Sequence, residues 1–203
     1  MLNLRAQSGY SLVELIVGLA ILAMLISLGI PEYSKFIANA RIRATSEGIA
    51  TGLNLARAEA VKRNARGEMV LTDDLPVEAQ VNIVTPATGG ANWIVREWVP
   101  NTNSFNFIEG KLGAEGSGRE EASVTVASSS VDATYDGRVA FTGFGSMAIG
   151  QPVSFQFTYP AAGLCAPAGP MRCLNINVSP GGQIRVCDPA VNPVTNPGDT
   201  RAC

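Results

Sequence analysis

The feature that most constrains this chain is an apolar run close to the N-terminus. Residues 15–30, LIVGLAILAMLISLGI, contain no charged side chain, and the apolar character reaches back to Tyr10 with one interruption at Glu14. A helix over residues 10–30 has 21 residues and a length of roughly 30 Å at the usual helical rise. The hydrocarbon core of a bilayer has the same thickness, so the run predicts a membrane-spanning helix.

The residues before the run do not form an ordinary secretory signal. Residues 1–9, MLNLRAQSG, carry one cation, Arg5, and lead directly into the apolar run. No small-residue cleavage site follows the run, so we expect the helix to be retained in the mature protein. The charge of Arg5 favours a cytoplasmic position for residues 1–9.

Glu14 is the exceptional residue of the predicted helix, because an unpaired carboxylate in apolar surroundings is costly. Two interpretations are open. Glu14 lies at the headgroup level and is hydrated, or it pairs with a cation that a neighbouring chain supplies. Cleavage between Gly9 and Tyr10 would free the α-amine of Tyr10, which could neutralise Glu14 of an adjacent subunit and set the axial register between the two.

Residues 9–15, GYSLVEL, resemble the processing motif of the type IV prepilins, whose usual form is Gly-Phe-Thr-Leu-Ile-Glu. In that family a membrane-embedded prepilin peptidase cuts after the glycine and N-methylates the new first residue. The resemblance implies that Gly9 is the cleavage residue, Tyr10 the methylated residue and Glu14 the assembly glutamate. It also implies four parts: a cleaved leader (1–9), a transmembrane and filament-core helix (10–30), an amphipathic helix (31–66) and a head (67–203).

The segment after the apolar run predicts a rod-like helix. Pro31 predicts a kink or local melting, because proline removes a helical hydrogen bond and clashes with the preceding turn. Residues 32–66 lack proline and are rich in helix-forming residues. One face repeats at spacings of four and three and predicts a contact stripe: Ile42, Ser46, Ile49, Leu53, Ala56 and Ala60. We expect the first half of the rod to pack between subunits and the second half to pack under a sheet.

Residues 67–203 are rich in strand patterns separated by turn residues. The predicted strands are 68–72, 78–84, 93–99, 105–109, 123–127, 138–142, 153–159, 173–178 and 183–187. Residues 110–122 predict a loop or an exposed hairpin tip. The expected fold is therefore α+β, with a long N-terminal helix packed on an antiparallel sheet, which is the pilin fold.

All four cysteines lie in the last part of the chain and contain no C-x-x-C pair: Cys165, Cys173, Cys187 and Cys203. This spacing favours two disulfides formed in an oxidising compartment over a zinc site. Three connectivities are open. We favour Cys165–Cys173, which closes a small loop, and Cys187–Cys203, which attaches the Pro- and Asn-rich tail.

Charge and composition argue against catalysis. The chain has no histidine, so the commonest general base and metal ligand are both missing. The adjacent acids Glu120–Glu121 and Asp73–Asp74 lie in predicted loops, and the serines 128–130 have no activating base. Residues 143–148, GFGSMA, match a dinucleotide fingerprint, but a strand pattern follows where that motif needs a helix, so we interpret them as a hairpin loop. We expect no enzyme, no cofactor and no metal.

Residues 53–66 resemble the end of this helix in the FimT/FimU minor pilins and the GspH-type pseudopilins of type II secretion. Residues 93–100 and 173–189 resemble the tryptophan-containing strand and the terminal hairpin of the same branch. Some FimT-like pilins bind DNA through a Gly-Arg-x-Arg motif on that hairpin. The corresponding residues 182–185 are Gly-Gln-Ile-Arg, so Arg185 matches and Gln183 does not, while Arg172 and Arg201 are candidates to compensate.

The charge is divided along the chain. Residues 31–66 carry seven cations and three anions, whereas the residues after 66 carry seven cations and thirteen anions. An acidic head repels a phosphate backbone, which argues against DNA binding.

The resemblance implies a minor pilin, a structural and assembly subunit of a type IV pilus. Its expected partners are major and minor pilins, the prepilin peptidase and the inner-membrane assembly platform. Its expected location is the inner membrane, as a single-pass protein with a periplasmic head, and the cell exterior once assembled. The alternatives are a minor pseudopilin of type II secretion and a pilin that binds DNA during natural transformation.

Overall fold

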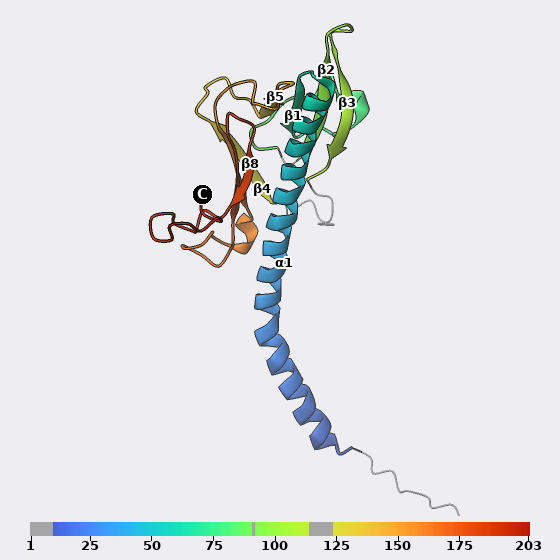
Figure 1. Cartoon of the computed structure of the whole chain (residues 1–203). Helices are drawn as coiled ribbons and strands as arrows, with labels where there is room; N and C mark the ends of the chain where they lie inside the picture. Colours follow the sequence, from blue (N-terminus) through green and yellow to red (C-terminus); the bar gives the residue numbers. More distant parts are fainter. Residues whose placement is uncertain (1–9, 91, 114–123) are drawn as a thin grey trace, which may run out of the picture. The chain divides into compact units, whose positions relative to one another are not determined.

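The computed structural model describes residues 10–90, 92–113 and 124–203 (Figure 1). Its one long helix, α1, runs from Leu12 to Arg63. The chain divides into two compact units, Met1–Ile37 and Ala38–Cys203, so α1 contributes to both. The predicted leader, residues 1–9, lies outside the described residues. In the first unit the described chain is helical from Leu12 onward, and its large apolar side chains are exposed.

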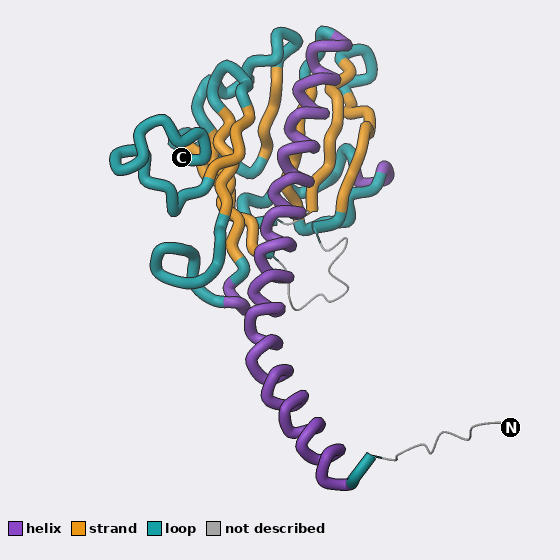
Figure 2. Tube along the Cα trace, turned by 60° about the horizontal axis from the view of Figure 1, so that its bottom comes forward, coloured by secondary structure: helices purple, strands orange, loops and turns teal. Residues whose placement is uncertain are grey.

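The second unit, which we call the head, contains two antiparallel sheets beside α1 (Figures 1 and 2). Sheet A has the order β3-β2-β1-β5, and sheet B has the order β4-β6-β7-β8. The strands of sheet A are β1 (Gly67–Thr72), β2 (Asn92–Val99), β3 (Ser104–Lys111) and β5 (Arg138–Phe141). Those of sheet B are β4 (Thr125–Ser130), β6 (Val153–Thr158), β7 (Leu174–Val178) and β8 (Ile184–Cys187). Two short 3-10 helices, η1 (Glu78–Gln80) and η2 (Pro160–Ala162), complete the described elements.

The predicted contact stripe of α1 forms the helical side of the head's core. All six of its residues are at most 1% exposed: Ile42, Ser46, Ile49, Leu53, Ala56 and Ala60. They pack with the inner faces of both sheets, including Met69 and Val95 of sheet A and Phe155 and Ile176 of sheet B. The α+β fold with a long helix on antiparallel strands is therefore confirmed, and the sheet is divided into two.

The outer face of sheet A has a second, smaller core. Val70 of β1 and Ile94 of β2 pack there against Val81 and Val84, with Phe105 and Phe107 partly buried at the edge. These side chains alternate along the strands with Met69, Leu71 and Val95, which face α1. Sheet A is therefore covered on both faces, by α1 on one and by the segment around η1 on the other.

The predicted strand at 78–84 is wrong, because this segment forms η1 followed by a turn. Val81 and Val84 are buried while Ile83 is exposed. A separation of three residues suits a helical turn, and a strand would have placed Val81 and Ile83 on one face. The segment is drawn into this shape because it must cover the outer face of sheet A.

Three further differences are smaller. Helix α1 is continuous across Pro31, so the expected local melting is absent, while a kink there stays a prediction. Strand β3 extends to Lys111, into the segment expected to be a loop, and residues 114–123 lie outside the described residues. Strand β4 begins at Thr125, two residues later than predicted, and ends at Ser130.

Each of the four edge strands is partly covered along its outer edge by another segment of the chain. The side-chain amide of Asn82 accepts from the Phe105 N–H of β3 at 2.7 Å, and the Thr88 carbonyl accepts from the Ser128 N–H of β4 at 2.7 Å. Residues 146–148 pair with β5, and the C-terminal tail pairs directly after β8 through the Asp188–Ala202 bridge and bonds to Arg185 of β8. Such covers block strand addition at exposed edges.

Candidate functional site

Ser11 caps the N-terminus of α1. Its Oγ accepts a hydrogen bond from the Glu14 N–H at 3.2 Å, and its carbonyl accepts the first helical bond from Leu15 at 3.2 Å. A serine at the N-cap with a glutamate three residues later is the pattern of a capping box. The helix therefore begins two residues after Tyr10, and Glu14 lies in its first turn.

Glu14 is exposed in this first turn, where the free N–H groups of the helix favour a negative charge. Tyr10 is 86% exposed, directly before the cap. Gly9, the predicted cleavage residue, lies outside the described residues. The local structure thus holds Glu14 one helical turn from the point where a new N-terminus would begin.

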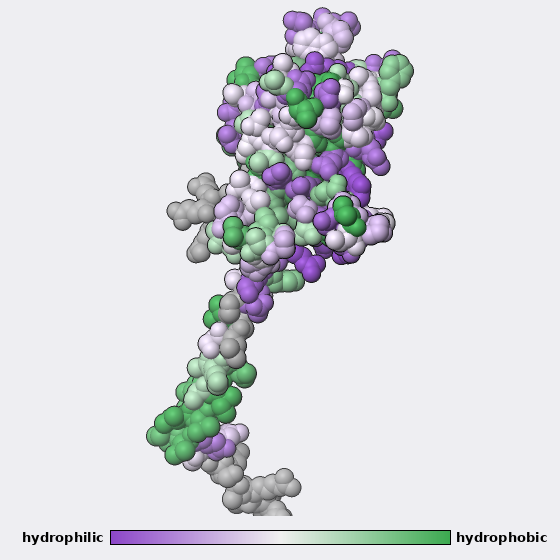
Figure 3. All heavy atoms as spheres, turned by 90° about the vertical axis from the view of Figure 1, so that its left-hand side faces the viewer, coloured by the Kyte–Doolittle hydropathy of each residue, from purple (hydrophilic) through white to green (hydrophobic). Residues whose placement is uncertain are grey.

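The segment that follows Glu14 presents apolar side chains on every side. Leu15, Leu19 and Met24 are each more than half exposed, and Figure 3 shows hydrophobic residues gathered on the visible face of this part of the helix. Among the described residues, α1 is the one helix whose length and composition would allow it to cross a bilayer. Apolar surface of this extent is unstable in water, so the segment requires lipid or other apolar helices around it.

The structure forms the disulfides Cys165–Cys173 and Cys187–Cys203, the connectivity that the sequence analysis favours. The first closes the loop before β7. The second joins the end of β8 to the end of the tail. In the described residues, no group of three or more Asp, Glu, His or Cys side chains is arranged to hold a metal ion.

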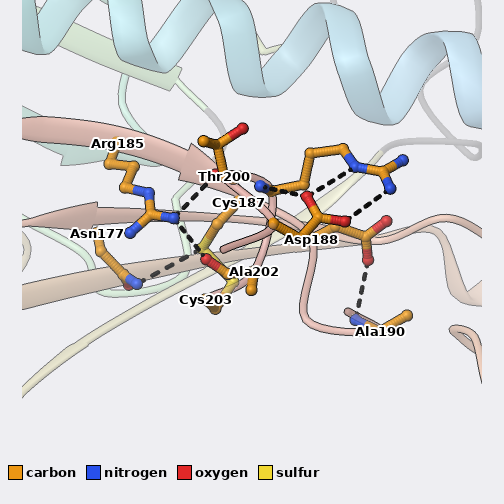
Figure 4. The surroundings of a disulfide bond; sticks show 10 residues. Asn177, Arg185, Cys187, Asp188, Ala190, Thr200, Ala202 and Cys203 are labelled. Atoms are coloured by element: carbon orange, nitrogen blue, oxygen red, sulfur yellow. Dashed lines mark hydrogen bonds and ion pairs between the residues drawn. A yellow bond between two sulfur atoms is a disulfide. The ribbon is translucent and has the colours of Figure 1, made fainter. Parts of the chain in front are cut away.

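Arg185, the candidate DNA contact, lies on β8 and binds the tail instead. Its Nη2 donates to the backbone carbonyls of Thr200 and Ala202, at 2.8 Å each (Figure 4). Together with the disulfide beside it, Arg185 fastens the tail across the edge of sheet B. Nη2 carries two hydrogens, one for each carbonyl, so this nitrogen has a structural role in holding the tail.

The other two arginine candidates lie in different settings. Arg201 forms an ion pair with Asp199 at 2.8 Å, and its hydrogen bonds hold the pKa of Asp199 at about 2. Arg172 belongs to the loop before β7, where its backbone N–H donates to Oδ1 of Asn39 on α1 at 2.8 Å. The structure therefore places Arg185 and Arg201 beside the tail and Arg172 beside the helix.

The glycine-rich residues 143–148 form a tight turn rather than a dinucleotide site. The Thr142 N–H donates to the Ser146 carbonyl at 2.9 Å, and β6 is the next regular element. Gly182 of the β7–β8 turn approaches so closely that an added Cβ would lie 1.9 Å from the Gly145 carbonyl oxygen. Nε of Arg57 donates to the same oxygen at 3.0 Å, so α1 and both sheets meet at this point.

The acidic and serine candidates have structural roles or lie outside the description. The Asp74 carboxylate accepts from the Thr85 N–H at 2.8 Å, and the Ser128 hydroxyl donates to the Thr88 carbonyl at 2.9 Å. Glu120 and Glu121 lie outside the described residues. These contacts fix loops against the sheets.

A buried ion pair on the outer face of sheet A was not predicted from the sequence. Glu68 is 0% exposed and Arg96 is 4% exposed, and the two are direct partners in the β1–β2 register. Their shortest N–O distance is 2.7 Å, and Arg96 also lies 3.8 Å from the centre of the Phe105 ring. The sequence signal was one acid and one base within two strongly apolar strands, and only the register shows that they pair.

Comparison with known proteins agrees with this arrangement. The model of the family described as type II transport protein GspH matches residues 45–182, and the prokaryotic N-terminal methylation motif matches residues 4–30. A capped apolar helix that continues into a head of antiparallel strands defines a pilin-like subunit. Since the first match covers more than half of the chain, the protein belongs to the GspH family.

Two solved structures are similar to this chain. The type IV minor pilin FimU of Pseudomonas aeruginosa strain PAO1 is 14% identical, with a TM-score of 0.51, over 74% of this chain and 91% of that chain. The minor pseudopilin EpsH of the type 2 secretion system of Vibrio cholerae is 8% identical, with a TM-score of 0.48, over 74% of this chain and 99% of that chain. The first likeness supports the pilin fold. Family and fold are those of structural subunits that assemble with other pilins.

Proposed function

We propose that this chain is a minor pilin of a type IV pilus, processed between Gly9 and Tyr10 and inserted into the filament through α1. The observation that carries the proposal is the sequence of features at the N-terminus. A methylation motif spans residues 4–30, Ser11 caps the helix, Glu14 lies in the first turn, and exposed apolar side chains follow. An isolated soluble protein would expose this apolar surface to water, which is unfavourable.

In this proposal the α-amine of Tyr10, N-methylated after cleavage, neutralises Glu14 of a neighbouring subunit. The carboxylate is exposed in the helix's first turn and therefore accessible to such a partner. An ion pair gains strength in apolar surroundings of low dielectric constant, where an unpaired charge is strongly disfavoured. The pair would thus allow only one axial register between adjacent helices.

The proposal includes a location and a set of partners. The methylation motif and the apolar helix indicate membrane anchoring. We place the protein in the inner membrane as a single-pass subunit, with its head in the periplasm before assembly and outside the cell afterwards. Its partners would be the prepilin peptidase, the assembly platform and other pilins, both major and minor.

Mass spectrometry of the mature N-terminus tests processing. We expect the chain to begin at methylated Tyr10 and to retain residues 10–30. An intact Met1, or a product that lacks the apolar segment, would contradict the proposal.

Recovery of the full chain in sheared pili tests the role of Glu14. Glu14→Ala is expected to leave cleavage intact and to reduce recovery strongly, because the incoming amine loses its partner. Glu32→Ala on the same helix is the matched control, since Glu32 pairs within its own chain with Lys35 at 2.7 Å. Equal recovery of the two variants would exclude the pairing role.

A second candidate is a minor pseudopilin of type II secretion, because the matching family is described as a type II transport protein. The same processing and helix would serve either filament. Deletion of the gene separates the two: loss of twitching with normal protein secretion supports the pilus, and the reverse result supports the secretion system.

DNA binding receives no support from the hairpin that suggested it. Nη2 of Arg185 donates to two backbone carbonyls of the tail, and Arg201 is paired with Asp199. These contacts give both arginines a role within the tail, and the excess of acidic residues in the head repels a phosphate backbone. Because residues 182–185 also lack the first arginine of the motif, nucleic acid is the least supported of the proposed partners.

A further inference from the structure

A loop without polar side chains lies at the end of the head where α1 enters it. Residues 160–171 contain only Ala, Gly, Pro, Leu, Cys and Met, and seven of them are exposed. Leu164, the largest exposed side chain among them, is 68% exposed. Loops that face water are normally polar, so this segment, which we call the apolar loop, is unusual for the surface of a soluble domain.

The apolar loop is held by its own backbone. The disulfide Cys165–Cys173 closes it. The Met171 N–H donates to the Leu164 carbonyl at 3.1 Å, and the Ala166 N–H donates to the Met171 carbonyl at 2.7 Å. Leu164 is therefore exposed on a fixed backbone, and its binding to a partner would cost little conformational entropy.

Two contacts attach the apolar loop to the first residues of α1 within the head. The Arg172 N–H, directly after the loop, donates to Oδ1 of Asn39 at 2.8 Å. Nη1 of Arg41 donates to the hydroxyl of Tyr159, directly before the loop, at 2.9 Å. In Figure 1 the loop is the orange segment beside α1 at the lower end of the head. The apolar loop thus lies beside the residues through which the helix enters the head.

The residues just before the head indicate the level in a bilayer at which it begins. The apolar run ends at Ile30, and Tyr33 and Phe36 follow with exposed fractions of 66% and 70%. Exposed aromatic rings beyond an apolar run are typical of the boundary between lipid and water. Asn39 is three residues after Phe36, so their Cα atoms are at most about 11 Å apart whatever the angle between the two units. The chain connection alone therefore keeps the apolar loop near the headgroups.

The charges around the apolar loop suit an anionic surface. Residues 137–187 contain no acidic residue, so the excess of acids in the head lies elsewhere. Arg172 and Arg43 are exposed, and neither belongs to an ion pair among the described residues. Arg43 lies one helical turn beyond Asn39 on the same face of α1, and Glu47 lies a further turn away from the loop.

We propose that the apolar loop docks on the periplasmic leaflet of the bilayer that holds α1. Leu164 would insert among the lipids, and Arg172 and Arg43 would bind anionic phospholipid headgroups. Apolar side chains bordered by cations are typical of surfaces that lie in a membrane interface. Long arginine side chains can extend along apolar surface while their charged groups reach the headgroups.

The chain itself identifies the bilayer as the occupant, because the helix that leads into the loop's contacts is the one we propose to span the membrane. In that respect the inference rests on the proposed function. The contact would hold the head at the membrane surface until the subunit is inserted into a filament.

Fluorescence quenching by lipids tests the contact in the full chain. A polarity-sensitive fluorescent amino acid is placed at one position at a time, and the chain is reconstituted in vesicles of phosphatidylcholine and phosphatidylglycerol with brominated acyl chains. Bromine quenches only those fluorophores that enter the bilayer. The positions are Leu164, Leu19 of the apolar helix, which is 57% exposed, and Val131 of the head.

Val131 is the matched control, an exposed apolar residue at the opposite end of sheet B. It is 77% exposed and follows β4 directly, where Ser130 pairs with Val153 at the start of β6. The apolar loop comes after the other end of β6, beyond Thr158.

We expect quenching at positions 19 and 164 and none at position 131. Quenching at 19 without quenching at 164, or equal quenching at 164 and 131, overturns the loop contact and leaves the role in the pilus standing. Absence of quenching at 19 means that the helix is not inserted, and it overturns both the membrane anchor and this inference.

Removal of single charges tests the role of the headgroups. Arg172→Gln and Arg43→Gln are each expected to lower the ratio of docked to undocked heads about fivefold, as measured by quenching at position 164. The contact of Arg172 with Asn39 uses the backbone N–H and does not depend on the arginine side chain. Lys62→Gln removes the same charge roughly 30 Å farther along α1 than Arg43 and should leave the ratio unchanged. Equal ratios in the wild type, Arg172→Gln and Lys62→Gln would overturn the contact with anionic headgroups.

Discussion

The two units use the same helix in opposite ways. In the first unit, residues such as Leu25 and Ile30 are 62% exposed, and the residues around them are apolar on all sides. In the head, Leu53 and Ile49 are at most 1% exposed, and polar residues occupy the opposite helical face. Both segments have helical hydrogen bonds throughout, so backbone structure does not distinguish them. The difference lies in where each one finds its apolar contacts.

This difference indicates which unit buries its apolar surface without another molecule. The head buries its apolar stripe against its own sheets and has the core of an independent domain. The first unit has no such partner among the described residues, and it must obtain one from a bilayer or from other helices. Substitutions in the head should therefore change folding, and equivalent substitutions in the first unit should change only membrane or filament behaviour.

The largest expected effect is loss of the buried charge pair. Glu68→Gln leaves Arg96 charged and 4% exposed without its counter-ion, and should destabilise the head by about 3–5 kcal/mol. Glu32→Gln in the first unit removes an exposed pair and should cost about 0–1 kcal/mol. Denaturant unfolding of the full chain in detergent, followed by the fluorescence of Trp93 and Trp98, measures both. Equal effects would show that the pair does not contribute to the head.

The next effect compares one substitution at two places in the same helix. Leu53→Ala opens a cavity under the sheets and should destabilise the head by about 2–5 kcal/mol. Leu25→Ala removes the same atoms from an exposed position and should leave the unfolding of the head unchanged. Thermal unfolding followed by the near-ultraviolet circular dichroism of Trp93 and Trp98 reports the head, because both tryptophans lie in it. A shift for Leu25→Ala would show that the units are energetically coupled.

The buried face of α1 in the head could be predicted from the sequence. The stripe from Ile42 to Ala60 follows the period of a helix, and a period is a local property that needs no knowledge of the partner. The strands followed from alternation and turn residues for the same reason. The N-terminal motif was equally readable, since its residues are contiguous.

The features that could not be predicted from the sequence depend on contacts between residues that are distant in the chain. The segment 78–84 looks like a strand by composition, but its shape is set by the outer face of sheet A, which it covers. The pairing of Glu68 with Arg96 follows from the strand register. The hydrogen bonds of Arg185 depend on the path of the C-terminal tail, which runs beside β8. The sequence contains these residues without showing which of them meet.

A smaller expected effect concerns the tail. Replacing Cys187 and Cys203 by serine should destabilise the head by about 3 kcal/mol, and replacing Cys165 and Cys173 by about 2.5 kcal/mol, because the longer loop loses more entropy on closure. Limited proteolysis should show early cleavage within residues 188–203 in the first variant only. Protection of the tail in that variant would show that Arg185 and the Asp188–Ala202 bridge hold it without the disulfide.

The smallest expected effect is the response of the tail to acid. Hydrogen bonds from Arg201 lower the pKa of Asp199 to about 2 from 3.8, so the folded state favours the ionised carboxylate. The stabilisation is therefore complete above about pH 4 and is lost as the pH falls through about 2. Pepsin digestion between pH 4 and pH 2 should cleave the tail progressively in the wild type, as detected after reduction of the Cys187–Cys203 disulfide. Asp199→Asn should be cleaved in the tail at pH 4 already, and identical profiles for the two proteins would refute this.

The covered strand edges have a consequence for subunits that are packed side by side in a fibre. Subunits held side by side experience a very high local concentration of identical sheets, the condition under which free edges fuse into continuous cross-β structure. Asn82, Thr88, residues 146–148 and the tail cover part of each of the four edges, which disfavours such pairing between neighbouring heads. Contacts made through side chains separate without unfolding, so partly covered edges favour a fibre whose heads can dissociate.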